Sequence, residues 1–426
     1  MNDKINDKKT EIELMAPAGS YEALRAAIQA GANSVYFGIG PLNMRARAAN
    51  NFTLKDLKKI VTICQQHHLK SYLTLNTIIY DQDLTQMKKI CTAAKKAGLT
   101  AVICTDIAAI AYARSLGLQV HLSTQANLSN FGAVKFYAQF ADVLVLAREL
   151  TLPQINSIIK EIKKQNICGP SGKLVKIELF IHGALCVSIA GKCYMSLATY
   201  NHSANRGACL QNCRRAYRVI DDETGDELKI ENKYVMSPKD LCTIGCIDKI
   251  LQAGVTILKI EGRGRSPEYV YTTVKAYREA VDSYLQGTYS LDKIQRWTKA
   301  LETVFNRGFW QGGYYLGKKL GEWSGSYGSQ ATKKKIYVGV IKNYFSKPRI
   351  AEIKLEAEGI KAGDEIIITG PTTGIIQTKV NSIFIDRKGK DQPVQKAKKG
   401  ERITVPIAEK VRPHDKLFVL MDAKKE

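Results

Sequence analysis

The alternation of short apolar strands with amphipathic helices is the sequence feature that most constrains the fold. Eight strand-length apolar runs occur between Ile12 and Arg263, and helical patterns separate most of them. The predicted strands are IELMAPAG, SVYFGI, KSYLTLNT, TAVICTD, QVHLSTQ, DVLVLAREL, KIELFIHG and VTILKIEGR. Strands that alternate with helices form a parallel sheet. Closure into a TIM-like (β/α)8 barrel is the most economical arrangement for eight such units.

An open doubly wound sheet is the alternative architecture. It is disfavoured because no G-x-G-x-x-G motif follows any of the strands. Polar residues directly follow the predicted strand ends. They favour a barrel with an active site, since barrel active sites lie on the loops at the strands' C-terminal ends. The candidate site residues at these positions are Asn76, Gln125, Arg148, His182, Glu261 and Arg263.

A cysteine-rich stretch from Ile181 to Tyr217 follows the seventh predicted strand. Its four cysteines, called here the cysteine quartet, are Cys186, Cys193, Cys209 and Cys213. Close thiols in a reducing compartment suit a metal or an iron–sulfur cluster better than disulfides. Structural zinc usually takes two close pairs of ligands, whereas a cubane cluster tolerates the uneven spacing seen here. An iron–sulfur cluster at the barrel mouth is therefore expected, with zinc and free thiols as alternatives.

The net charge and the hydropathy of the sequence limit which binding partners and which cellular compartment we expect. The polar N-terminal stretch MNDKINDKKTEIELM is not a signal peptide, and no apolar run is long enough to span a bilayer. We therefore expect a cytoplasmic protein with no membrane partner. Lysine and arginine number 63 against 40 aspartates and glutamates, a formal net charge of +23. This excess favours a polyanionic partner, although a merely solubilising surface is the alternative.

The pattern changes to period two in the C-terminal part. Residues 324–335, SGSYGSQATKKK, are predicted to form a flexible basic linker. Short strands broken by turns then indicate a small antiparallel β-barrel over residues 336–426. The barrel domain with its helical extension is expected over residues 1–323, and the cluster segment over about residues 181–235.

Several stretches together resemble peptidase family U32, the collagenase-like protease family. They are ELMAPAGSYEALRAAIQAGANSVYFG, HLSTQANLSN, LAREL, HGALCVSIAGKCYMS, NRGACLQNCRRAY, MSPKDLC and LKIEGRGRSPEYV. The resemblance implies an RNA or quinone-precursor hydroxylase with a 4Fe-4S cluster, despite the family's name. The C-terminal segment is similar to the branch of prephenate-dependent tRNA hydroxylases, which make 5-hydroxyuridine at the wobble position. It is also similar to the second-domain barrel of translation factors, which commonly contacts RNA.

Carried over to this chain, the resemblance assigns the cysteine quartet as cluster ligands, with Cys242 as a possible substitute for Cys213. It implies that prephenate is a co-substrate whose carboxylates pair with Arg148, Arg263 and either Arg45 or Arg47. It also implies that the anticodon arm of tRNA is the macromolecular partner. A homologous subunit or a second copy of the chain is a further expected partner.

The remaining candidates have both functional and structural interpretations. His182 suits a general acid or base near neutral pH, or else it holds the cysteine segment in place. Glu261 is either catalytic or orients Arg263. Gln125 and Asn76 are expected to hydrogen-bond substrate or RNA, because amides do not titrate.

Three other functions remain open. A ribosomal RNA hydroxylase would share the barrel and the cluster. A peptidase would need Cys186 paired with His182, since neither H-E-x-x-H nor G-x-S-x-G occurs. A non-catalytic RNA-binding maturation partner would bind tRNA without modifying it.

Overall fold

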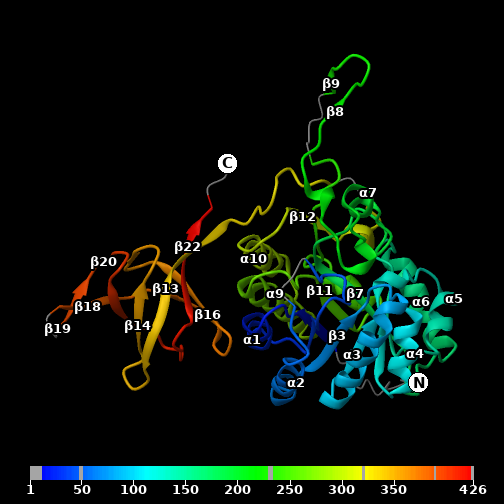
Figure 1. Ribbon diagram of the computed structural model, residues 1–426, viewed down its shortest axis with the longest axis horizontal. Helices are drawn as coiled ribbons and strands as arrows, with labels where there is room; N and C mark the ends of the chain where they lie inside the picture. The colour runs from blue at the N-terminus through cyan, green and yellow to red at the C-terminus, as the bar shows by residue number, and fades with distance from the viewer. Residues whose placement is uncertain (1–11, 48–50, 229–233, 319–321, 388–389, 424–426) are drawn as a thin grey trace.

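The computed structural model describes residues 12–47, 51–228, 234–318, 322–387 and 390–423. The polar N-terminal stretch lies outside the described residues, as do residues 229–233 of the predicted cluster segment. A helix-wrapped barrel forms one part of the chain, and an antiparallel β domain lies beside it (Figure 1).

The barrel consists of eight parallel strands. They are β1 (Glu13–Pro17), β2 (Ser34–Gly38), β3 (Lys70–Leu75), β4 (Ala101–Cys104), β5 (Gln119–Leu122), β6 (Val143–Val145), β7 (Lys176–Gly183) and β11 (Ile257–Ile260). Strands β1 to β7 pair in chain order, and β11 closes the circle by pairing in parallel with both β7 and β1. The predicted TIM-like barrel is confirmed, and the open-sheet alternative is wrong.

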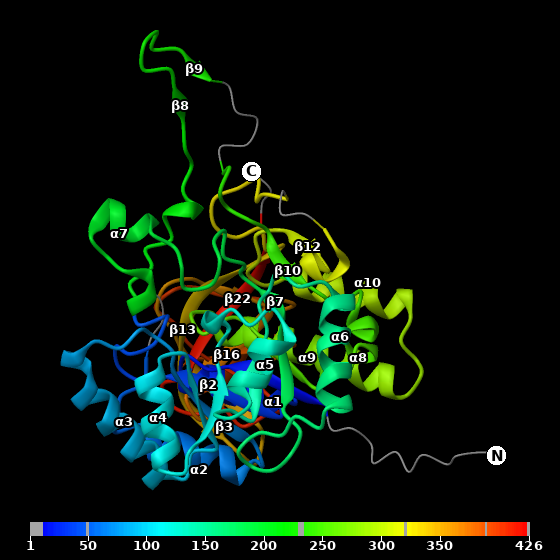
Figure 2. The same cartoon turned by 90° about the vertical axis from the view of Figure 1, so that its right-hand side faces the viewer.

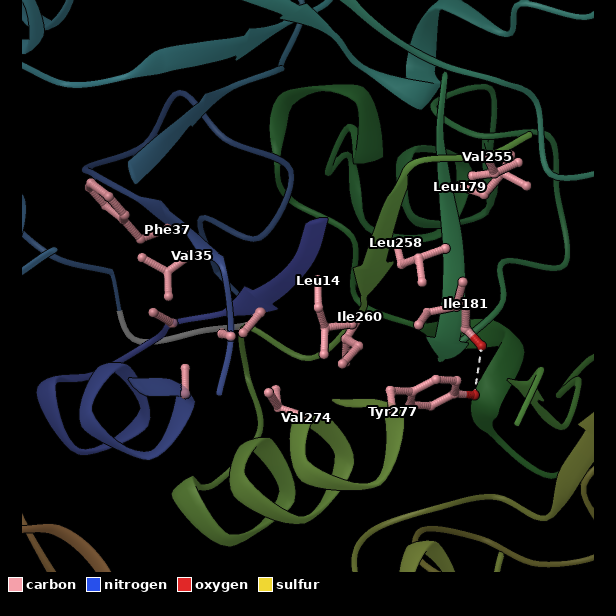
Figure 3. Packing of buried hydrophobic residues seen from close by; sticks show 14 of the residues in the cluster. Leu14, Val35, Phe37, Leu179, Ile181, Val255, Leu258, Ile260, Val274 and Tyr277 are labelled. Carbon is pink, nitrogen blue, oxygen red and sulfur yellow. Dashed lines mark hydrogen bonds between the residues drawn. The ribbon is translucent and has the colours of Figure 1, made fainter. Parts of the chain in front are cut away.

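Side chains alternate between the barrel interior and the surrounding helices. Leu14 of β1 joins the large cluster between strands and helices, whereas its neighbour Met15 packs inside with Tyr36 and Tyr72. Figure 3 shows Leu258 and other strand residues facing the helical layer. Both faces of the strands are buried, which explains their nearly continuous apolar sequences.

Helices cover the outside of the barrel. They are α1 (Tyr21–Gln29), α2 (Leu57–Gln66), α3 (Leu84–Ala97), α4 (Ile107–Ser115), α5 (Phe131–Tyr137), α6 (Leu152–Lys164), α8 (Ile247–Gln252), α9 (Pro267–Leu285) and α10 (Leu291–Glu302). Side-chain oxygens of Ser20, Asp106 and Asn130 accept backbone N–H bonds at the starts of α1, α4 and α5. None of the described helices combines the length and apolar character needed to cross a bilayer.

The cysteine-rich insertion lies between β7 and α8. It contains α7 (Met195–Tyr200), the two short strands β8 (Val219–Ile220) and β9 (Glu227–Leu228), and β10 (Asp240–Cys242). The β8–β9 hairpin projects away from the barrel (Figures 1 and 2). β10 pairs antiparallel with β7, and β12 (Phe309–Gln311) pairs with β10, so two strands extend the sheet outside the closed barrel.

An ion pair lies inside the barrel at the seam between β7 and β11. Lys259 Nζ is 2.7 Å from Glu178 Oε1, and both side chains are buried. His121 Nδ1 lies 3.7 Å from the other carboxylate oxygen of Glu178. Although burial favours the neutral acid, the charge of Lys259 and the contacts with His121 hold the pKa of Glu178 below its usual value. The seam therefore carries a charge pair in place of apolar packing.

The C-terminal domain is antiparallel throughout, as predicted. Its strands are β13 (Lys333–Phe345), β14 (Ile350–Leu355), β15 (Ile360–Lys361), β16 (Glu365–Gly370), β17 (Gly374–Lys379), β18 (Ile383–Arg387), β19 (Lys390–Val394), β20 (Lys396–Ala397), β21 (Arg402–Pro406) and β22 (Lys416–Asp422). Eight of them form one sheet in the order β17-β16-β22-β13-β14-β21-β18-β19, and β15 pairs with β20. Seven strands of that sheet contribute to a single hydrophobic cluster, so the sheet curves around one core.

The β domain is attached to the barrel by direct contacts. Gln29 of α1 donates to the Thr373 carbonyl and accepts from the Ile375 N–H, each at 3.0 Å. Lys335 pairs with Glu268 of α9 at 2.9 Å. β13 begins at Lys333, inside the predicted linker 324–335, so the last residues of that stretch belong to the sheet.

Replacing Glu178 with glutamine should destabilise the barrel strongly. The charge of Lys259 would stay buried without a counter-ion, which costs about 3–5 kcal/mol. Urea denaturation followed by circular dichroism measures the free energy of unfolding. The matched control is Glu161→Gln on α6, whose exposed pair with Lys164 should contribute less than about 1 kcal/mol. Equal losses in the two variants would contradict the importance of the buried pair.

Candidate active site at the barrel mouth

A cavity of about 350 Å³ lies at the C-terminal ends of the barrel strands. Tyr36, Phe180 and Lys259 line it from the strands, and residues of the cysteine-rich insertion line it from the other side. The insertion thus covers the mouth of the barrel, the face on which active sites of this architecture are found.

All four members of the cysteine quartet line this cavity. None of them forms a disulfide; Cys186 is exposed and the other three are partly buried. Burial raises the pKa of the Cys213 thiol, and the neighbouring quartet cysteines raise it further, against the opposing charge of Arg214. The quartet is therefore close enough together for its members to interact electrostatically.

The arrangement of the quartet bears on which metal it suits. In the described part of the chain, no group of three or more histidine, cysteine or acidic side chains is arranged to hold a metal ion. A single zinc ion needs its four ligands around one point, whereas the four thiolates of a cubane bind different iron atoms and stand farther apart. Four cysteine thiols that line one cavity are the kind of donor set that a cubane cluster takes, and the expected cluster stays a prediction.

The other cysteines lie elsewhere. Cys242 is buried on β10, where its Sγ lies 3.9 Å from the Tyr277 hydroxyl, and it does not line the cavity. Cys213 lines the cavity. The structure therefore gives no support to Cys242 as a substitute for Cys213 among the cluster ligands. Cys64, Cys91 and Cys104 are fully buried in the barrel core, as predicted.

Positive charge dominates the cavity wall. The basic residues among the described lining are Arg45, Arg148, Arg214, Lys259, Arg263, Arg265 and Arg307, and the acidic ones are Glu149 and Glu261. Cations that enclose a small volume attract anions strongly, because the low-dielectric walls focus their field. The cavity is therefore suited to a carboxylate or phosphate ligand.

Glu261 pairs with Arg45 across the mouth, at 2.9 Å between Oε1 and Nη2. Burial alone would raise the pKa of Glu261, but the charges of Arg45, Arg265 and Arg148 lower it to about 2. A carboxylate with so low a pKa is a weak base near neutral pH. The expectation that Glu261 orients Arg263 is wrong, because its ion-pair partner is Arg45.

Arg263 and Arg148 line the cavity as predicted, and each is held by neutral partners. The Arg263 guanidinium donates to Asn43 Oδ1 at 2.9 Å and to Thr74 Oγ1 at 2.8 Å. Arg148 donates to the Ala184 carbonyl at 3.1 Å, and its Nε is buried without an acceptor among the described residues. These neutral partners do not neutralise the guanidinium charges, so both arginines are able to pair with an anionic ligand.

Asn76 and Gln125 are brought together at the same mouth. Asn76 Nδ2 donates to Gln125 Oε1 at 3.1 Å, and Asn76 Oδ1 accepts from the Met44 N–H at 3.2 Å. Gln125 lies on the short 3-10 helix Thr124–Ala126 after β5. The two side-chain amides therefore hold each other in a fixed orientation, which suits them to hydrogen-bond a ligand.

His182 does not line the cavity. A register shift in the β7–β11 pairing breaks the strand alternation, and its ring packs against Tyr269 and Tyr277 of α9 and Phe309 of β12. Burial lowers the pKa of His182 to about 3, so the ring is neutral at physiological pH. The position fits the structural interpretation of His182 better than the acid–base one.

Sequence reasoning missed three cations of the cavity. Lys259 left a signal in the sequence, because it is a charged residue within the otherwise apolar and fully buried strand β11. Arg265 and Arg307 gave none, since they follow loops whose course depends on the whole fold. Arg307 reaches the mouth from beyond α10 and lies 3.5 Å from buried Asp240.

Comparisons with known proteins agree with this architecture. A "Collagenase" of Porphyromonas gingivalis is 57% identical over 408 residues, covering 96% of this chain and 97% of that protein. The "tRNA hydroxylation protein P1" of Bacillus subtilis is 30% identical over 390 residues, covering 87% and 88%. A 23S rRNA 5-hydroxycytidine synthase of Escherichia coli is 33% identical over 304 residues, 70% of this chain and 44% of that protein. Relatives of this chain thus include proteins named for hydroxylation of RNA.

A family profile described as "Peptidase family U32" matches residues 19–325. That range contains seven of the eight barrel strands, β2 to β7 and β11, together with the cysteine quartet and the cations of the cavity. Because the match covers well over half of the chain, the protein is a member of peptidase family U32.

Proposed function

We propose that this protein hydroxylates a base in RNA, with the wobble uridine of tRNA modified at C5 to 5-hydroxyuridine. The observation that carries the proposal is the cationic cavity at the barrel mouth, which the whole cysteine quartet lines. RNA hydroxylation in the named relatives supports the reaction class. The net charge of +23 supports a polyanionic substrate.

The size of the cavity suits small ligands such as a single base and a small organic acid. Its volume of about 350 Å³ is near the lower end of ordinary ligand pockets. A base in an unpaired anticodon loop is cheap to extrude, because no base pair has to be broken. Prephenate is the proposed co-substrate, with Arg148 and Arg263 pairing with its carboxylates, while Asn76 and Gln125 hydrogen-bond the base.

The cysteine quartet is the proposed holder of a 4Fe-4S cluster. When bound, such a cluster supplies electron transfer or Lewis acidity beside the cavity. The Arg45–Glu261 pair fixes one wall of the cavity, and Glu261 remains ionised because its pKa lies far below neutrality. Glu261 therefore acts in this proposal by positioning Arg45, and His182 by supporting the end of β7.

A peptidase is the second candidate, because the relative with 57% identity is named collagenase. A cysteine peptidase needs a histidine beside its nucleophile. No histidine is among the described residues that line the cavity, and His182 lies in the layer against α9. The pairing of Cys186 with His182 that a cysteine peptidase would need has no support in this geometry, which favours the hydroxylase.

Iron should accompany the purified protein and depend on the quartet. Anaerobic purification is expected to give a brown protein with about four irons per chain, and Cys209→Ala should lose most of them. Cys242→Ala and Cys168→Ala are controls that should keep iron, since neither residue lines the cavity. Iron analysis and absorption spectra measure the outcome. Zinc in place of iron, or gelatin cleavage by iron-free protein, would overturn the proposal.

Loss of the gene should remove 5-hydroxyuridine from tRNA. Mass spectrometry of nucleosides from a deletion strain measures this loss in tRNA and ribosomal RNA separately. Expression of the wild-type chain or of Cys168→Ala should restore the nucleoside, whereas Cys209→Ala should not. A loss confined to ribosomal RNA would select the ribosomal alternative, and unchanged RNA of both kinds would contradict RNA hydroxylation.

Replacement of His182 by glutamine should cost stability and leave catalysis largely intact. The rate per folded molecule should change less than about 3-fold, compared with the roughly 10²–10⁴-fold contributed by a general acid or base. Because the pKa of His182 is lowered to about 3, the wild-type rate should show no inflection from this residue between about pH 5 and 8. Single-turnover rates across that range provide the measurement. An acidic limb that disappears in His182→Gln would restore the acid–base role.

A further inference from the structure

A second hollow is lined in part by the cysteine-rich insertion. Its volume is about 1180 Å³, and three parts of the chain line it: the loop after β2, the region from Tyr80 to Ile90, and residues 197–208 of the insertion. This volume exceeds the usual range for small-molecule pockets, about 300–1,000 Å³. An extended segment of a polymer therefore suits the hollow better than a compact ligand.

An aromatic ring and a guanidinium form a fixed pair in this hollow. The Arg206 guanidinium carbon lies 3.8 Å from the centre of the Tyr80 ring, and the ring is 51% exposed. Arg206 is locked by Asp83 at 2.6 Å, and Asp83 also accepts the Tyr80 N–H at 2.9 Å. A rigid, half-exposed tyrosine beside a cation is a platform on which a nucleobase stacks.

The electrostatics of the hollow favour an anionic polymer. Arg47, His202 and Arg206 line it, and no carboxylate is among its described lining residues. Proteins that bind single-stranded nucleic acid combine an aromatic surface on which the bases stack with cations that contact the phosphates.

One stretch of chain separates the hollow from the cavity at the barrel mouth. Ala204 and Cys209 line the mouth cavity, whereas Arg206 and Gly207 between them line the hollow. This wall is fixed, because Ile78 N donates to the Asn205 carbonyl at 3.1 Å. Gly207 has φ +80°, and a Cβ there would come within 2.3 Å of the Asn43 carbonyl oxygen. A strand of RNA that reaches the mouth has the hollow immediately beside it.

We propose that the hollow binds a single-stranded RNA nucleotide that flanks the base in the mouth cavity. The flanking base stacks beside Tyr80 and Arg206, and its phosphate pairs with Arg47. This proposal rests on the proposed function and adds to it a location for RNA outside the reaction cavity. It makes an unpaired loop, and not a duplex, the preferred substrate.

Titration of a fluorescent RNA hairpin with an anticodon-sized loop tests the hollow independently of catalysis. Tyr80→Ala should weaken binding on the order of ten-fold with little change in salt dependence, because it removes stacking. Arg47→Ala should weaken binding and reduce the slope of log K against log salt by about 0.7, the value for one phosphate contact on a single strand. Tyr327→Ala is the matched control, because Tyr327 is 72% exposed and lines neither cavity.

The outcomes separate this inference from the proposed function. If wild-type protein modifies RNA but Tyr80→Ala binds the hairpin as tightly as Tyr327→Ala, the hollow is not the flanking-nucleotide site and the function stands. If wild-type protein binds no hairpin and modifies no RNA, the function itself fails. A fully paired duplex that competes as well as the hairpin would also overturn the inference. Saturating hairpin should restore the single-turnover rate of Tyr80→Ala, since the loss is expected in binding alone.

Discussion

The buried pair of Lys259 and Glu178 marks the interaction on which the rest of the structure depends. It joins β7 to β11, the two strands that must meet for the barrel to close although the whole cysteine-rich insertion separates them in the chain. Two opposite charges inside the barrel are stable only as partners, because either one alone carries a large desolvation cost. The pair therefore favours the correct pairing of two strands that lie far apart in the chain.

The pairing of β7 with β11 also shapes the cavity at the barrel mouth. Gly183 ends β7 with φ +107°, and a Cβ there would come within 2.7 Å of the Glu261 carbonyl oxygen, so the two strand ends approach as closely as backbones can. Lys259 lies on the floor of the cavity, and Glu261 pairs with Arg45 at its edge. The same contact that closes the barrel thus places the cysteine-rich insertion over a cationic mouth.

The distribution of charge links this site to the hollow beside it. In the mouth cavity, Arg148 and Arg263 are held by neutral carbonyl, amide and hydroxyl acceptors, whereas Arg45 and Arg307 pair with Glu261 and Asp240. A cation that is positioned by neutral acceptors keeps its field, whereas a matched ion pair largely cancels it. In the hollow, Arg206 is paired with Asp83, whereas exposed Arg47 has no ion-pair partner among the described residues. Both surfaces are suited to a single chain of phosphates and bases.

The sequence alone determined the architecture and the membership of the cysteine quartet. Strand and helix periodicities are local properties of the sequence. They therefore allowed β1 to β7, β11 and the antiparallel C-terminal domain to be predicted from the sequence. Polar residues after parallel strands converge in any such barrel, which placed Arg148, Arg263, Asn76 and Gln125 at the mouth. Only the tertiary structure decided that His182 faces α9, that Arg45 is the partner of Glu261, and that Arg307 arrives from beyond α10. Those outcomes depend on a shift in strand pairing and on packing between residues far apart in the chain. Neither feature produces a periodic pattern in the sequence, so neither could be predicted from it.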